Sequence, residues 1–195
     1  MGGFAYDNGV FIRRLVMLAL ERNMSETKTY ETFPLWIPAL AILVSVISYI
    51  LGAIVLLGFG IIVAALYLVY CIGIELLVIF RSCKYCYYHH RVCGLGKGKI
   101  ASVITKKGDP KKFTEREVSF ADMIPDFLVA IFPIVGGIIL SVLDFSLIRI
   151  ILLVLIVLLS FGGTAVIRGS FACNYCKQRE IGCPADQLFN KKTSK

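Results

Sequence analysis

Charged residues and histidines are scarce in this chain. Only 17% of its 195 residues are charged, and its two histidines, His89 and His90, are adjacent. No nucleophile is paired with a base, and no nucleotide-binding fingerprint is present. The run 94–99, Gly-Leu-Gly-Lys-Gly-Lys, lacks the strand and spacing of a phosphate-binding loop, so we expect a structural turn there, with an anion or lipid-headgroup site as the alternative. Whether the chain is an enzyme stays open.

Apolar residues, in contrast, are abundant and gathered in two blocks. They make up 57% of the chain, against about 45–50% in a typical soluble domain. Residues 33–80 contain one formal charge, Glu75, and the second block covers residues 118–167. Because a membrane-crossing helix needs about 20 apolar residues, each block holds two spans. The spans are predicted at 34–53, 57–80, 121–143 and 147–168, with the first turn at 49–54.

The N-terminal segment has no short apolar core followed by a small-residue cleavage site, so we expect no cleaved signal peptide. Residues 10–22 place Phe11, Leu15 and Leu18 on one face, which predicts an interfacial amphipathic helix.

Thr114 and Glu117 have the spacing of a capping box and predict the start of the helix that leads into the third span. The chain divides into an N-terminal segment, 1–33, a first repeat, 34–120, and a second repeat, 121–195.

The basic residues predict the orientation in the membrane. Four precede residue 34, ten lie in the central loop 81–116, and six follow residue 167, which leaves only Arg149 between the third and fourth spans. Because lysine and arginine remain on the cytosolic side, we expect both termini and the central loop in the cytosol. The net charge of +8 is then explained by orientation and by an anionic inner leaflet, not by nucleic acid.

Two cysteine motifs predict an internal repeat. Residues 83–93 (the first motif) and 173–183 (the second motif) both have the pattern Cys-x-Tyr-Cys-x6-Cys, and all three cysteines match at an offset of 90, since 173 − 83, 176 − 86 and 183 − 93 are equal. Each motif directly follows the second span of its hairpin. The fold class is therefore an all-α integral membrane protein of two parallel-repeat helical hairpins, in which a pseudo-twofold axis brings the motifs together.

The six motif cysteines are the candidate metal ligands: Cys83, Cys86, Cys93, Cys173, Cys176 and Cys183. On the reducing side of a membrane, such pairs indicate a metal or redox site more often than disulfides. The Cys-x2-Cys-x6-Cys spacing resembles one half of the fungal binuclear zinc cluster, in which two such halves hold two zinc ions with six thiolates. The resemblance is one of spacing, and it implies coordination and no DNA function.

Three arrangements of the metal remain open. Six thiolates share two zinc ions, the two Cys-x2-Cys pairs hold one zinc ion or one iron–sulfur cluster, or each motif binds its own ion. In the third arrangement, His89 or His90 would complete the first site, and Glu180, Asp186 or an outside ligand the second.

Glu75 is a candidate functional residue because a carboxylate inside a span is costly and needs a partner. Asp122 and Asp126 are candidate neighbours, although we expect them to face the N-terminal dipole of the third span.

The sequence thus predicts a membrane-bound protein with a structural zinc site. An iron–sulfur electron-transfer subunit is the alternative, and a metal-ion transporter is a third. The expected partners are the bilayer, with its anionic inner leaflet, and either further copies of this chain or a membrane redox partner.

Overall fold

The computed structural model describes residues 29–115 and 119–184. The amphipathic helix predicted at residues 10–22 lies outside this range. Within it, four helical segments are long and apolar enough to cross a membrane, namely Trp36–Phe59, Ile61–Tyr85, Ala121–Leu143 and Leu147–Tyr175. The shortest has 23 residues, which exceeds the roughly 20 that a span requires. The all-helical class and the four long apolar helices are therefore confirmed.

The first three of these segments are formed by α2 (Trp36–Leu56) with the 3-10 turn η1 (Leu57–Phe59), α3 (Ile61–Arg81) and α6 (Phe120–Leu143). The fourth combines α7 (Leu147–Val157), the π-helical turn η3 (Leu158–Gly163), α8 (Thr164–Val166) and the π-helical turn η4 (Ile167–Ala172). The central loop between α3 and α6 forms two further helices, α4 (Lys97–Ile104) and α5 (Lys111–Thr114).

The turn between α2 and α3 was predicted in the wrong place. Residues 49–54 lie inside α2, and the chain turns instead at Gly60. Gly60 has a φ of 118°, a backbone conformation that side chains with a Cβ rarely adopt. A lack of charge does not locate a turn within a block that is apolar throughout, whereas a glycine that can adopt positive φ does.

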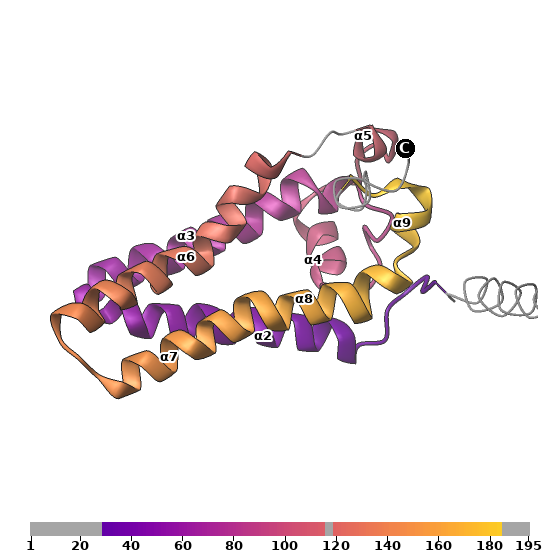
Figure 1. Ribbon diagram of the computed structural model, residues 1–195. Coiled ribbons are helices and arrows are strands. Elements are labelled where there is room, and N and C mark those ends of the chain that lie inside the picture. Colours follow the sequence, from indigo (N-terminus) through magenta and orange to yellow (C-terminus); the bar gives the residue numbers. More distant parts are fainter. Residues whose placement is uncertain (1–28, 116–118, 185–195) are drawn as a thin grey trace, which may run out of the picture.

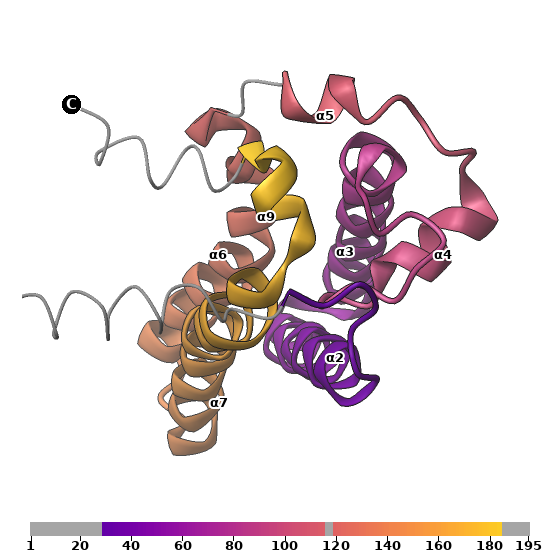
Figure 2. The same ribbon diagram turned by 90° about the vertical axis from the view of Figure 1, so that its right-hand side faces the viewer.

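The helices form an elongated bundle with two different ends (Figure 1). The turns from α2 to α3 and from α6 to α7 lie at one end, which we call the turn end. The opposite end, the motif end, carries α4, α5 and α9 (Lys177–Gly182). Seen from the motif end, α4 lies beside α2 and α3, on the side away from α6 and α7 (Figure 2). The lysine-rich central loop is thus separated from Arg149, at the turn end, by the length of the bundle.

Helix α6 contains two prolines and is tied to α3 where one of them breaks its hydrogen bonding. Pro133 has no backbone N–H, so the carbonyl of Val129, four residues earlier, loses its helical partner. The hydroxyl of Tyr67 on α3 donates to that carbonyl at 2.9 Å. Tyr67 also packs on Gly52 of α2, where a Cβ would lie 2.6 Å from its hydroxyl oxygen. A tyrosine thereby joins three helices at one point.

The start of α6 differs from the prediction. The cap is Ser119, whose hydroxyl accepts from the backbone N–H of Ala121, while the carboxylate of Asp122 accepts from the backbone N–H of Ser119 at 3.1 Å. Thr114 instead closes α5, its hydroxyl donating to the carbonyl of Lys111, and Glu117 lies outside the described residues. Ser119 prevails because it directly precedes the apolar run. Asp122 faces the helix N-terminus as expected.

Arg149, the exception in the charge pattern, has a structural role at the turn end. Its guanidinium donates to the carbonyl of Leu140 at 2.6 Å and lies 3.6 Å from the carboxylate of Asp144. Leu140 belongs to the last turn of α6, and its carbonyl also accepts from the backbone N–H of Asp144 at 2.9 Å. The same guanidinium donates to the carbonyl of Asp144, the residue that ends α6. Arg149 therefore caps the C-terminus of α6.

Candidate functional site

Both cysteine motifs begin with the same tight turn. Cys83–Tyr85 and Cys173–Tyr175 are 3-10 turns, η2 and η5, that form the last residues of the second and fourth apolar segments. The N–H of Cys86 donates to the carbonyl of Cys83 at 3.3 Å, and that of Cys176 to Cys173 at 3.2 Å. In each motif, the first two cysteines therefore lie on one short turn, as two ligands of a single ion require.

The motifs diverge after their second cysteine. The N–H groups of His89 and Arg179, again 90 residues apart, donate to the carbonyls of Cys86 and Cys176 at 3.1 and 3.0 Å. The second motif then continues as α9, since Lys-Gln-Arg-Glu are good helix formers. The first motif has aromatic residues and histidines at these positions and forms turns instead, with His90 at a φ of 72°. The third cysteines therefore differ in backbone setting: Cys183 directly follows α9, whereas Cys93 lies in a non-helical stretch.

Hydrogen bonds connect the two motifs directly. The backbone N–H of Tyr87 donates to the side-chain carbonyl of Gln178 at 2.7 Å, and the backbone N–H of Lys177 donates to the hydroxyl of Tyr88 at 3.0 Å. Gln178 is buried although it is polar. No sequence pattern marks Gln178 as a contact residue beyond its place inside the second motif. The motifs, far apart in sequence, therefore meet at the motif end as predicted.

A buried aromatic cluster lies between the motifs. Phe33, Ile37 and Tyr88 form its centre, and three motif cysteines pack against it: Cys86, Cys93 and Cys176. Tyr30 joins the cluster from the segment before α2, and its N–H donates to the carbonyl of Tyr175 at 2.9 Å. Cysteines from both motifs consequently share one apolar environment.

Two of the thiols at this cluster, Cys86 and Cys176, are deactivated as nucleophiles. Burial, with a smaller contribution from nearby motif thiols, raises the pKa of Cys86 to about 12 and that of Cys176 to about 11. Both groups are therefore protonated at neutral pH, and a thiol is a poor nucleophile compared with a thiolate. These two thiols are therefore poorly suited to thiol–disulfide exchange. No disulfide joins any of the seven cysteines.

The side chains do not form a ready metal site in the part of the chain that is described. Within residues 29–115 and 119–184, no group of three or more Cys, His, Asp or Glu side chains could hold one ion. The sulfur of Cys93, for example, accepts a hydrogen bond from the N–H of Gly98 at 3.2 Å. Cys173 is exposed, whereas the other five motif cysteines are half-buried.

The candidate additional ligands differ in accessibility. His89 is buried, its Nε2 lies 3.0 Å from the carbonyl of Thr105, and its Nδ1 has no hydrogen-bond partner. Burial lowers the pKa of His89, which keeps the ring neutral. His90 and Glu180 are exposed, and Asp186 lies outside the described residues.

Glu75, the candidate inside the second span, is held by partners from two elements. Its carboxylate lies 2.6 Å from the ammonium of Lys97 on α4 and accepts a hydrogen bond from the hydroxyl of Tyr49 on α2 at 2.7 Å. Asp122 instead lies 3.7 Å from Arg81. The glycine-rich run 94–99 predicted a turn, and no sequence pattern indicated this ion pair. The turn is present, but Lys97 begins α4 and extends into the bundle.

Comparison with protein-family models, curated proteins and solved structures gives no match for this chain. The fold itself defines the class. Four helices that are long and apolar enough to cross a membrane indicate a multi-pass membrane protein of the helical type.

Proposed function

We propose that the two cysteine motifs bind zinc and that the metal fastens the two helical hairpins together on the cytosolic side of a membrane. The observation that carries this proposal is the direct contact between the motifs, through Tyr87 with Gln178 and Tyr88 with Lys177. The equal turns at the two Cys-x2-Cys pairs support it, as does the shared cluster that Cys86 and Cys176 contact.

Metal binding in this proposal requires the cysteine side chains to reorient, because the sulfur atoms do not converge. Rotation about a cysteine Cα–Cβ bond moves its sulfur without moving the backbone, and the two matching turns supply the backbone that such ligands need. Zinc would deprotonate the thiols it binds and offset the cost of their burial, so metal binding and local folding are coupled.

The repeat and the orientation belong to the same proposal. Two parallel hairpins would place both motifs on one side of the membrane, and the basic residues put that side in the cytosol. The reducing cytosol would keep all six thiols available for metal. The metal then has a structural role, because it lies beside the helices and not among them.

An iron–sulfur cluster and a metal-ion pathway are the competing functions. Six cysteines also suit an iron–sulfur cluster, which would give the protein a brown colour. A cation pathway needs an available acidic group among the spans, and the carboxylate of Glu75 is already paired with Lys97. The contacts of Glu75 therefore favour a structural role for this carboxylate over cation binding.

Elemental analysis of the full chain, purified without oxygen or added chelator, tests the proposal. We expect stoichiometric zinc and a colourless sample. The double variant Cys83→Ser/Cys173→Ser should lose zinc, whereas Cys71→Ser should keep it, since Cys71 is buried within α3, away from the motifs. A metal-free chain that folds normally would refute the proposal. A brown sample that contains iron would refute zinc and support the iron–sulfur cluster.

A further inference from the structure

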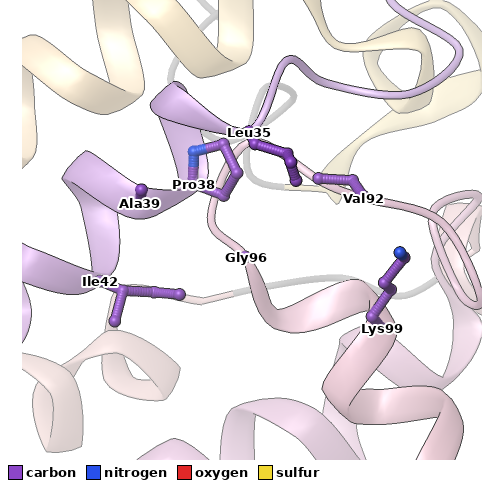
Figure 3. A pocket seen from close by; sticks show the side chains of 7 residues that line it. All are labelled: Leu35, Pro38, Ala39, Ile42, Val92, Gly96 and Lys99. Carbon is purple, nitrogen blue, oxygen red and sulfur yellow. The ribbon is translucent and has the colours of Figure 1, made fainter.

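An apolar groove lies at the motif end between the start of α2 and the start of α4. It has a volume of about 320 Å³ and is lined by six apolar residues and one lysine, namely Leu35, Pro38, Ala39, Ile42, Val92, Gly96 and Lys99 (Figure 3). Leu35 immediately precedes α2, and Ile42 lies two turns further along it. The groove therefore runs along the first two turns of a membrane-crossing helix, from its end towards its middle.

Lys99 supplies the positive charge at this groove. Lys97 and Lys99 are two residues apart on α4, so they project about 200° apart around the helix. Lys97 extends inward to Glu75, whereas Lys99 is exposed along the groove, and no carboxylate among residues 29–115 and 119–184 pairs with its ammonium. The groove thus combines an apolar wall with one cation that is available to a ligand.

The outer face of α4 is apolar as well. Ile100, Val103 and Ile104 are exposed, Val103 to 88%. An eight-residue helix with exposed aliphatic side chains and lysines is typical of the membrane interface. Trp36, beside the groove, is half-exposed and suits the same depth. The groove consequently opens where phospholipid headgroups meet their acyl chains.

We propose that this groove is a binding site for one anionic phospholipid, with an acyl chain along α2 and the phosphate paired with Lys99. The occupant is a lipid because the wall is apolar along the helix axis and the single cation lies at one side of it. An anionic headgroup is preferred over a zwitterionic one because it leaves a net negative charge beside the ammonium. This inference rests on the membrane-spanning fold and is independent of zinc.

Native mass spectrometry of the full chain in mild detergent tests the site, with phosphatidylglycerol and phosphatidylcholine of identical acyl chains as probes. We expect the first bound phosphatidylglycerol to be preferred about fivefold, as one lysine near the surface provides. Lys99→Gln should remove the preference and Lys99→Arg should keep it. Lys106→Gln is the matched control, because Lys106 is exposed in the same loop but does not line the groove.

A second pair of variants tests the apolar wall. Ala39→Phe fills the groove and should weaken the binding of both lipids, whereas Leu40→Phe, on the neighbouring exposed position, should not. The proposal is overturned if the wild-type chain shows no preference, if Lys106→Gln acts like Lys99→Gln, or if Ala39→Phe binds lipid like the wild type. If Lys99→Gln does not fold, the comparison of lipid binding by Ala39→Phe and Leu40→Phe still tests whether the groove is the lipid site.

Discussion

The backbone N–H of Lys177 donates a hydrogen bond to the hydroxyl oxygen of Tyr88 at 3.0 Å. The same hydroxyl donates to the carbonyl of Tyr30. One buried tyrosine side chain therefore connects the first motif, the second motif and the segment that enters α2. This connection is what makes the two motifs one structural unit at the motif end.

Replacement of Tyr88 by phenylalanine should loosen that unit. The change keeps the ring but leaves the Lys177 N–H and the Tyr30 carbonyl without their partner, at a cost of about 1–3 kcal/mol. Thermal unfolding in detergent measures the loss. Tyr85→Phe is the control, since no hydrogen bond of the Tyr85 hydroxyl is found within the described part of the chain. Equal stability of the two variants would contradict the linking role of Tyr88.

The contact between Tyr67 and Val129 makes a prediction within the bundle. Tyr67→Phe should destabilise the fold by about 1–3 kcal/mol. The Val129 carbonyl would lose its hydrogen-bond donor, because Pro133, four residues later, has no backbone N–H to replace the Tyr67 hydroxyl. Tyr70→Phe should cost less. Its hydroxyl also donates to α6, but to the carbonyl of Pro125, which keeps the N–H of residue 129 as its regular partner. Denaturant titrations of both variants test the difference, and a larger loss for Tyr70→Phe would be inconsistent with it.

The Glu75–Lys97 pair predicts an energetic coupling between α3 and α4. Lys97→Met and Glu75→Gln each leave a partly buried charge without its opposite charge, and each should cost about 2 kcal/mol. The double variant removes both groups and should cost clearly less than the sum of the single losses. A double-mutant cycle of unfolding free energies measures this coupling. Strictly additive losses would show that the pair contributes nothing, and Lys99→Met serves as the control on the same helix.

Gly98 makes a steric prediction about how α4 is held. A Cβ at this position would lie 2.4 Å from the backbone carbonyl oxygens of Arg91 and Tyr88, which cannot move without deforming the first motif. Gly98→Ala should therefore destabilise the motif end. Gly73→Ala is the matched control, as a Cβ there meets nothing within 4 Å, and in a helix alanine should be favoured over glycine by about 1 kcal/mol. Hydrogen exchange of α4 and the first motif would reveal the change, and an unaltered exchange pattern would count against the packing.

Sequence patterns predicted the parts of this fold that depend on long runs. Two apolar blocks predicted four helices long enough to cross a membrane, because block length alone fixes how many spans fit. The patterns failed where single residues decide. The turn at Gly60 and the Ser119 cap depend on local backbone conformation, which an apolar count does not register.

The candidate site was predictable in composition but not in geometry. The spacing of Cys83 and Cys86 fixes a tight turn, and the same turn recurs at Cys173 and Cys176. The contacts that join the motifs come from Tyr88 and Gln178, whose residue types carry no metal-binding signal. Likewise, Lys97 lies within a glycine-rich run, and only the packed structure shows that it reaches Glu75 instead of solvent.

Whether the two motifs form one zinc site is the central question, and the zinc content of a chain altered in one motif alone answers it most directly. In Cys83→Ser/Cys86→Ser, the second motif keeps all three of its cysteines. If the ligands are shared, elemental analysis of the folded variant should show loss of all the zinc that the wild-type chain carries. Retention of half of that zinc would mean two independent sites, and an unchanged zinc content would mean that these cysteines hold no metal; either result would contradict a shared centre.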